Sequence, residues 1–250
     1  MLLEYDGAAY RGSQCQANGP SIQAELEAAI NKLTGETRRV EFAGRTDSGV
    51  HALGQVAAFD SGSRLAETEL LRGLNHFLPE DIAARAVREA QRDFDPRRDA
   101  TSRVYRYRID NRPVRSALTR GRAWHVAVPL DVARMTEGAK RLEGRHDFAA
   151  FAGPYEGQTR RTLSRCEVHA EHGEVVVEMQ AEAFLPHQVR RTVGPLVEVG
   201  RGHRDLAWLE SLLREAAPSS AGPVAPACGL YLVRVAYDGF EFGPPEEWMD

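Results

Sequence analysis

Residues 102–111 alternate in character along the chain, and this alternation constrains the fold more than any other feature. Three large side chains would share one face of an extended strand there: Tyr105, Tyr107 and Ile109. Two further strand-like stretches, 163–170 and 174–183, are separated by His172-Gly173, which is typical of a hairpin. Neighbouring strands joined in this way pair antiparallel, so the sequence predicts at least one antiparallel sheet.

Helical stretches are mixed with these strands. Apolar residues recur every three to four positions, which predicts helices over 21–34, 68–78, 131–143, 187–197 and 205–213. Pro195 should kink the fourth helix or end it early. A charged, linker-like segment from Pro96 to Ser102 marks a boundary between subdomains 1–100 and 101–250. We therefore expect an α+β protein in which helices cover the faces of largely antiparallel sheets.

Positive charge gathers in one part of an acidic chain. The 250 residues carry a net charge of −4, yet residues 97–122 hold nine arginines against Asp99 and Asp110, a balance of +7. Lys32 and Lys140 are the chain's two lysines, so almost every cation is arginine, which binds phosphates in bidentate fashion and stacks on bases. A genome-wide bias in composition would explain the choice of arginine. The clustering favours a surface that binds a polyanion such as RNA.

The chain has the composition of an ordinary globular protein, with 42% hydrophobic residues. No run approaches the roughly 18 apolar residues of a membrane span, and a strand-like stretch begins directly after Met1, which leaves no room for a signal peptide. Cys15, Cys166 and Cys228 are widely spaced and lack metal-type pairing. We expect a reduced, cytoplasmic protein without a membrane partner.

Residues 44–51, Gly-Arg-Thr-Asp-Ser-Gly-Val-His, form a polar stretch between two apolar ones. Its two glycines predict a loop that connects two strands. An aspartate between Ser or Thr and Gly is usually a turn residue, and this is one interpretation of Asp47. The other is that Asp47 is a reagent, since a guanidinium, two hydroxyls and an imidazole lie within a few residues of it. The loop by itself leaves both interpretations open.

Other short stretches follow in a fixed order along the chain. They include Tyr5-Asp6-Gly7, Leu74-Asn75, Val189-Arg190 and residues 21–27, 102–107, 144–148 and 229–232. Together with residues 44–52 they resemble the TruA-type tRNA pseudouridine synthases across nearly the whole chain. Ser13, Gln188, Ala227-Cys228 and Pro195 depart from the family's usual pattern, which bears on RNA contacts and local packing.

The resemblance implies a fold and a reaction. The fold has two α/β subdomains with largely antiparallel mixed sheets flanked by helices, and an active-site cleft between them. In the reaction, uridine at positions 38, 39 and 40 of the tRNA anticodon stem-loop becomes pseudouridine, as the N-glycosidic bond is cleaved and C1′ is rejoined to C5. The protein would act on tRNA as a homodimer. No step is a net oxidation or consumes a nucleotide, so neither a cofactor nor a metal is implied.

The resemblance also assigns roles to residues. Asp47 would be the nucleophile, attacking either C1′ or uracil C6, with Arg45 beside it. Tyr105 would stack on the flipped base and serve in proton transfer, Arg190 would supply a second cation, and Leu230 would line the site. Five arginines would hold RNA phosphates: Arg97, Arg98, Arg103, Arg106 and Arg108.

Two rival functions fit part of the sequence. A non-catalytic RNA-binding module would explain the arginines and tyrosines but leaves Asp47 without a role. A glycosidase would use Asp47, but it requires a second acid or a metal cluster that the sequence does not offer. A synthase that recaptures uracil without water needs one carboxylate, which matches the solitary Asp47.

Overall fold

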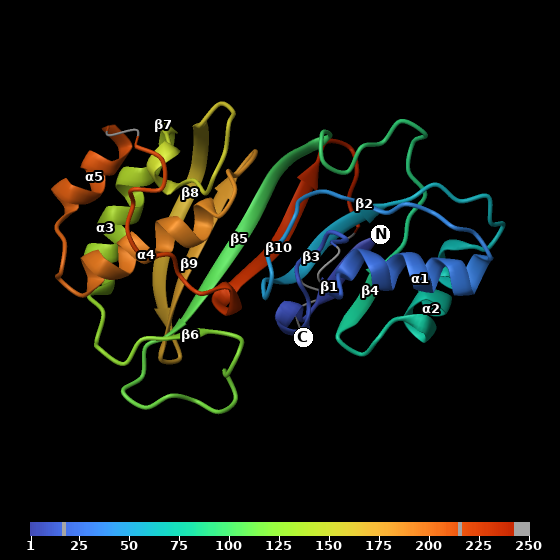
Figure 1. Cartoon of the computed structure of the whole chain (residues 1–250), viewed down its shortest axis with the longest axis horizontal. Helices are drawn as coiled ribbons and strands as arrows, with labels where there is room; N and C mark the ends of the chain where they lie inside the picture. Colours follow the sequence, from blue (N-terminus) through green and yellow to red (C-terminus); the bar gives the residue numbers. More distant parts are fainter. Residues whose placement is uncertain (17–18, 215–216, 243–250) are drawn as a thin grey trace. The chain divides into compact units, whose positions relative to one another are not determined.

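The computed structural model describes residues 1–16, 19–214 and 217–242, which form two compact units (Figure 1). The first unit comprises Met1–Thr101 together with the chain from Leu232 on, and the second comprises Ser102–Tyr231. The division between the two units falls near residue 101. The end of the chain differs from the expected division, because the last strand returns to the first unit and lies beside a strand of its sheet.

The first unit is a sheet with two helices. Its strands are β1 (Leu2–Tyr5), β2 (Glu41–Phe42), β3 (His51–Ala58), β4 (Ile82–Ala86) and β10 (Leu230–Tyr237), in the order β4-β1-β3-β10 with β2 beside β3. Strand β1 pairs antiparallel with β3 and β4, as does β2 with β3. Gly54 permits the close approach of β10, since a Cβ there would lie 2.3 Å from the carbonyl oxygen of Val233. The two helices, α1 (Ile22–Thr34) and α2 (Glu67–Phe77), lie side by side (Figure 1).

The residues that predict the ends of α1 cap the helix in the structure. Ser21 precedes the helix and its Oγ accepts a hydrogen bond from the backbone N–H of Ala24 at 3.2 Å. Gly35 ends the helix in the left-handed conformation, with φ of 74°, and its N–H donates to the carbonyl of Asn31. Between these caps Leu26 and Ile30 are fully buried. Local sequence is therefore sufficient to place this helix.

The second unit has a four-stranded antiparallel path in the order β5-β9-β8-β7. These strands are β5 (Ala100–Asp110), β7 (Gly144–Asp147), β8 (Arg160–Glu171) and β9 (Glu174–Ala181), and β6 (Trp124–His125) pairs with β5 in parallel. The predicted hairpin is confirmed as β8 and β9, which turn at His172 and Gly173, both with positive φ. The pairing brings Arg106 of β5 opposite Glu178 of β9.

Three α-helices complete the second unit: α3 (Val132–Leu142), α4 (Gln188–Gly200) and α5 (Leu206–Arg214). They contact one another, and α3 packs on β8 (Figure 1). Short 3₁₀ helices η1 (Gly7–Ala9), η2 (Ala149–Phe151) and η3 (Ala227–Gly229) lie in connecting segments of the chain. No helix among residues 1–16, 19–214 and 217–242 is long and apolar enough to cross a membrane.

Of the two effects expected of Pro195, a kink or an early end of α4, the early end is wrong, because the helix continues to Gly200. Proline inside a helix costs about 3 kcal/mol through its missing N–H and its ring. Most of α4 is buried, including Val193, Leu196 and Val197 at 0% exposure, and burying each such side chain stabilises by about 1.5–3 kcal/mol. Tertiary packing therefore offsets the local penalty. The prediction of an α+β fold with largely antiparallel strands flanked by helices is confirmed.

Candidate active site

The loop that carries Asp47 joins β2 to β3, which pair antiparallel through Glu41 with Ala58 and Phe42 with Ala57. The N–H of Val50 donates to the carbonyl of Asp47 at 3.1 Å, so Asp47 is the first residue of a β-turn. Gly49, the third residue of that turn, has φ of 78°, a conformation that glycine adopts without strain. Gly49 therefore has the turn role that the sequence predicts for a glycine of this loop.

Thr46, directly before Asp47, is buried and held from three directions. Its N–H donates to Ser13 Oγ at 2.9 Å, and its carbonyl accepts from the Ser13 N–H at 3.0 Å. Its hydroxyl lies 2.8 Å from the hydroxyl of Tyr5, whose pKa burial raises to about 12, so this tyrosine stays neutral and hydrogen-bonding at neutral pH. A Cβ at Gly12 would lie 2.7 Å from the Thr46 carbonyl oxygen, so the segment before Ser13 must contain glycine there.

The residues after Asp47 are held as well. The Ser48 hydroxyl and the Gly49 N–H both donate to the carbonyl of Tyr10, at 3.2 and 3.4 Å. His51 is buried, accepts at Nδ1 from the N–H of Gly7 at 3.2 Å, and lies 3.0 Å from a carboxylate oxygen of Asp6. The imidazole thus ties the loop to the first residues of the chain.

The N-terminal segment is the part of the site that sequence reasoning missed. Ser13 stood out there only as a departure from the family pattern, and the role of Gln55 was not predicted. Gln55 is fully buried and its Nε2 donates to the Gly44 carbonyl at 2.8 Å, which fixes the start of the loop. No periodicity links residues 5–14 to residues 44–51, because their contacts arise only when β1 and β3 pair.

Burial alternates through the middle of the loop. Thr46 is buried, whereas Arg45 is exposed and Asp47 is partly exposed. In an extended segment, alternate side chains point to opposite sides. The burial pattern fits Arg45 and Asp47 on one side of the segment and Thr46 on the other. The arrangement presents one carboxylate and one guanidinium on a rigid loop, which suits a reagent better than a mobile surface turn.

The second unit holds the two tyrosines of β5 in different surroundings. Tyr107 is fully buried, its hydroxyl donates to the Pro226 carbonyl at 2.7 Å, and its ring fills the space where a Cβ on Gly229 would lie. Tyr105 retains 8% exposure and packs nearly perpendicular to Phe184, with ring centroids 5.1 Å apart. Tyr107 is built into the core, while Tyr105 lies at its margin.

Arg190 and Leu230 also belong to the second unit. Arg190 lies in the first turns of α4 and its Nε donates to the Ala225 carbonyl at 2.8 Å, while its own carbonyl accepts from the Ala225 N–H. Leu230 is buried where β10 begins, directly after η3. Gln188, another departure from the family pattern, is buried and accepts from the Leu185 N–H at 2.8 Å, which holds the start of the helix. Asp47 and Arg45 thus lie in one unit, and Tyr105, Arg190 and Leu230 lie in the other.

The predicted RNA-binding arginines are not equivalent. Arg106 and Arg108 form ion pairs at 2.8 Å with Glu178 and Glu174 of β9. The guanidinium of Arg103 donates to the carbonyl of Glu182. Arg97 and Arg98 are exposed in the turn before β5, where Arg98 lies 3.4 Å from Asp95. Carboxylates therefore neutralise part of the positive segment on the face of the sheet.

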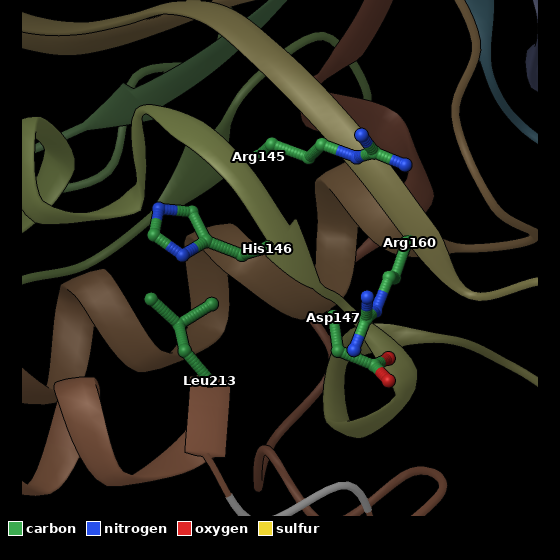
Figure 2. A pocket seen from close by; sticks show the side chains of 5 residues that line it. All are labelled: Arg145, His146, Asp147, Arg160 and Leu213. Carbon is green, nitrogen blue, oxygen red and sulfur yellow. The ribbon is translucent and has the colours of Figure 1, made fainter.

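A pocket of about 440 Å³ lies elsewhere in the second unit, at the edge strand β7. Figure 2 shows the side chains that line it: Arg145, His146, Asp147, Arg160 and Leu213. None of the predicted catalytic residues lines this pocket, so it gives no support for the predicted chemistry. Within the described part of the chain, no three His, Cys, Asp or Glu side chains are grouped to hold a metal ion. Cys15, Cys166 and Cys228 are all free.

Comparisons with known proteins agree with the sequence pattern. A family model described as tRNA pseudouridine synthase matches residues 1–97 and 139–238. A protein of Myxococcus xanthus named tRNA pseudouridine synthase A is 44% identical over 98% of this chain and 92% of its own length. Proteins of the same name from Blochmanniella pennsylvanica and Roseiflexus castenholzii are 41% and 45% identical over 99% and 95% of the chain, covering 95% and 89% of their own lengths. The similarity covers both units.

Proposed function

The chain belongs to the tRNA pseudouridine synthase family, and we propose that Asp47 is the nucleophile with which it isomerises uridine in the anticodon stem-loop. The enzyme converts uridine in tRNA to pseudouridine. We place the target uridines at positions 38, 39 and 40 by resemblance to the family. The observation that carries the role of Asp47 is its loop, in which the neighbouring residues are anchored while the carboxylate stays partly exposed.

The chemistry requires one carboxylate in a protected site. Breaking the bond from C1′ to N1 releases uracil as a delocalised anion and leaves positive charge developing at C1′. A carboxylate can capture that centre, or it can add to C6 of the uracil ring. The base then turns and C5 bonds to C1′. The bond from the carboxylate to C1′ or C6 breaks, which regenerates Asp47, while the proton on C5 leaves and N1 gains a proton, so atoms balance without a co-reactant. Arg45, two residues before Asp47, would supply a positive charge near the reacting centre.

We propose complementary roles for the residues of the second unit. A uridine in a stem must leave its stack before an enzyme can reach C1′, at a cost of a few kcal/mol. The Tyr105 ring, held by Phe184, would stack on the flipped base and assist removal of the C5 proton. Leu230 would contact the base from another side, and Arg190, oriented by the Ala225 carbonyl, would supply positive charge.

The partners are proposed on the same basis. The substrate is tRNA, and we propose that the enzyme acts as a cytoplasmic homodimer that needs no cofactor. The family resemblance supports the dimer, and the three free cysteines are in keeping with a reducing compartment. Positive residues of the 97–122 segment, including Arg97, Arg98, Arg103, Arg106 and Arg108, would supply the phosphate contacts.

Substituting Asp47→Asn tests the central role. Asparagine keeps the shape and also forms turns, so a structural role would leave activity nearly unchanged. If Asp47 is the nucleophile, tritium release from tRNA labelled at uracil C5 should fall at least ~10³-fold, which corresponds to roughly 4 kcal/mol of transition-state stabilisation. Thermal melting and tRNA affinity should stay close to wild type.

The exposed Asp60 in the same unit offers a matched control. Asp60→Asn should leave tritium release unchanged. Release by Asp47→Asn within tenfold of wild type would remove Asp47 from the mechanism. Free uracil in place of pseudouridine would indicate a glycosidase, and tRNA binding without any release would indicate a non-catalytic module.

A further inference from the structure

The loop between β5 and β6, residues 111–123, is the most basic exposed segment of the second unit. It contains four arginines and no acidic residue. They are Arg112, Arg115, Arg120 and Arg122. The loop follows Asp110, the last residue of β5, and leads into the buried Ala123 before β6. We call it the arginine loop.

A buried carboxylate organises the arginine loop from its base. Asp110 is 1% exposed and accepts from Arg112 Nε at 2.6 Å, from the Ser116 N–H at 3.3 Å and from the Thr119 hydroxyl at 3.0 Å. These contacts are reinforced at the far end, where the N–H groups of Arg122 and Ala123 donate to the Thr119 carbonyl. The loop is therefore ordered before any partner arrives.

Several side chains in the outer part of the loop are exposed to solvent. Leu118 and Val114 are 90% and 77% exposed. Arg115 and Arg120 are also exposed, and in the described chain neither forms an ion pair. This contrasts with Arg106 and Arg108 on the adjoining strand, each bound to a glutamate. The positive charge available to a ligand therefore lies on the loop more than on the sheet.

We infer that the arginine loop is a preorganised tRNA-binding element, in which Arg115 and Arg120 contact backbone phosphates and Leu118 packs against a sugar or base. The inference rests on the proposed function, which supplies the polyanionic substrate. Four arginines without a carboxylate complement such a backbone. The loop's 13 residues are also fewer than the roughly 20–30 that each side of a stable protein interface contributes. A preformed loop also avoids the entropic cost of ordering on binding.

The double substitution Arg115→Gln with Arg120→Gln tests the inference. Binding of a fluorescein-labelled tRNA transcript with uridine at positions 38, 39 and 40 is followed by anisotropy over a range of KCl concentrations. Each lost phosphate contact should reduce the slope of log affinity against log salt by about 0.7–0.9, so the pair should reduce it by about 1.5. Affinity at 0.1 M salt should fall about tenfold or more.

The matched control is Arg64→Gln with Arg72→Gln, which removes two exposed arginines of the first unit that also lack ion pairs in the described chain. Its slope should equal that of wild type. An equal loss in both pairs would mean that net charge alone matters, and the inference would fail. An unchanged slope for the loop pair would also overturn it, as would a drop in molecular mass by light scattering with unchanged tRNA affinity, which would assign the loop to contact between copies.

Turnover separates this inference from the proposed function. The Arg115→Gln, Arg120→Gln variant should release tritium with a raised KM for tRNA and a kcat within twofold of wild type, since neither residue belongs to the proposed catalytic set. If wild type releases no tritium, the proposed function fails, while the binding series still decides the loop. If wild type is active and the loop variant has an unchanged KM, only the loop inference fails.

Discussion

Tyr105 and Tyr107 lie two residues apart on one face of one strand, and alternation alone cannot distinguish them. Their environments can. The Tyr107 hydroxyl has a carbonyl partner in Pro226 and its ring is fully enclosed, whereas Tyr105 keeps a small exposed area beside Phe184. At the scale of single residues, the structure thus separates a fully enclosed tyrosine from one that keeps a small exposed area, as the proposed role of Tyr105 requires.

Leucine substitutions should reveal this difference. Tyr107→Leu should lower the free energy of unfolding by about 2–4 kcal/mol, since it leaves a cavity and removes the hydrogen bond to Pro226. Tyr105→Leu should melt within a few degrees of wild type yet lose at least ~10²-fold in tritium release. Thermal melting with the release assay measures both effects.

Tyr105→Phe is the control that separates the ring from the hydroxyl. If stacking dominates, this variant should keep most of its turnover, and if proton transfer dominates it should resemble Tyr105→Leu. A stable but inactive Tyr107→Leu variant beside an active Tyr105→Leu variant would reverse the two assignments.

At the scale of elements, two loops in this protein are held by residues that lie outside them. The Asp47 loop is bound by Ser13 and Tyr10 of the N-terminal segment. The arginine loop is bound by Asp110, whose pKa falls from its ordinary 3.8 to about 2, chiefly because Arg112 donates to it. Both loops therefore depend for their order on anchors outside their exposed parts.

The Asp110 anchor makes a prediction about stability and pH. A carboxyl whose pKa is lower in the folded state stabilises the fold above its unfolded pKa, and this stabilisation disappears as pH falls through the folded pKa. Asp110→Asn should therefore cost about 1–2 kcal/mol at pH 7, and the gap from wild type should narrow between about pH 4 and pH 2. Urea unfolding at several pH values measures the gap.

Asp93→Asn, at an exposed position without a described contact, is the matched control and should leave stability within about 0.5 kcal/mol of wild type. The stability difference between Asp110→Asn and wild type could instead stay constant from pH 7 to pH 3 and below. Its cause would then be the poor fit of the amide, and the proposal that the charge of Asp110 anchors the loop would be wrong.

For the whole molecule, charge is unevenly distributed. A chain of net charge −4 contains a segment of net charge +7, so total charge does not describe how it meets a polyanion. The reaction is an isomerisation. It rearranges one nucleotide, with no net oxidation and no group donated by a second substrate.

Catalysis should accordingly survive removal of divalent metals. Wild-type enzyme treated with excess EDTA and assayed on tRNA pre-folded in monovalent salt should release tritium at close to its untreated rate. The pre-folded substrate is needed because divalent ions also help tRNA to fold. Lost turnover that one specific metal restored, while tRNA structure stayed intact, would contradict the cofactor-free mechanism.

The sequence by itself determined the parts of this protein that depend on neighbouring residues. Alternation predicts β5, the stretches around His172-Gly173 predict the β8–β9 hairpin, and Ser21 with Gly35 predicts the ends of α1. The loop of Asp47 could be located in the same way, because its glycines and flanking apolar stretches are local signals. Its resemblance to a family of synthases rests on the order of such stretches.

Only the tertiary structure decided which distant residues meet. Ser13 anchors Thr46, and Arg106 pairs with Glu178, although the partners lie far apart in the sequence. Helix α4 continues through Pro195 because burial outweighs the local cost of proline. Such contacts depend on strand pairing and burial, which bring together residues tens of positions apart and leave no periodic trace in the sequence. Local sequence can therefore single out Asp47 as a candidate, but the fold determines how its loop is held and which arginines form ion pairs.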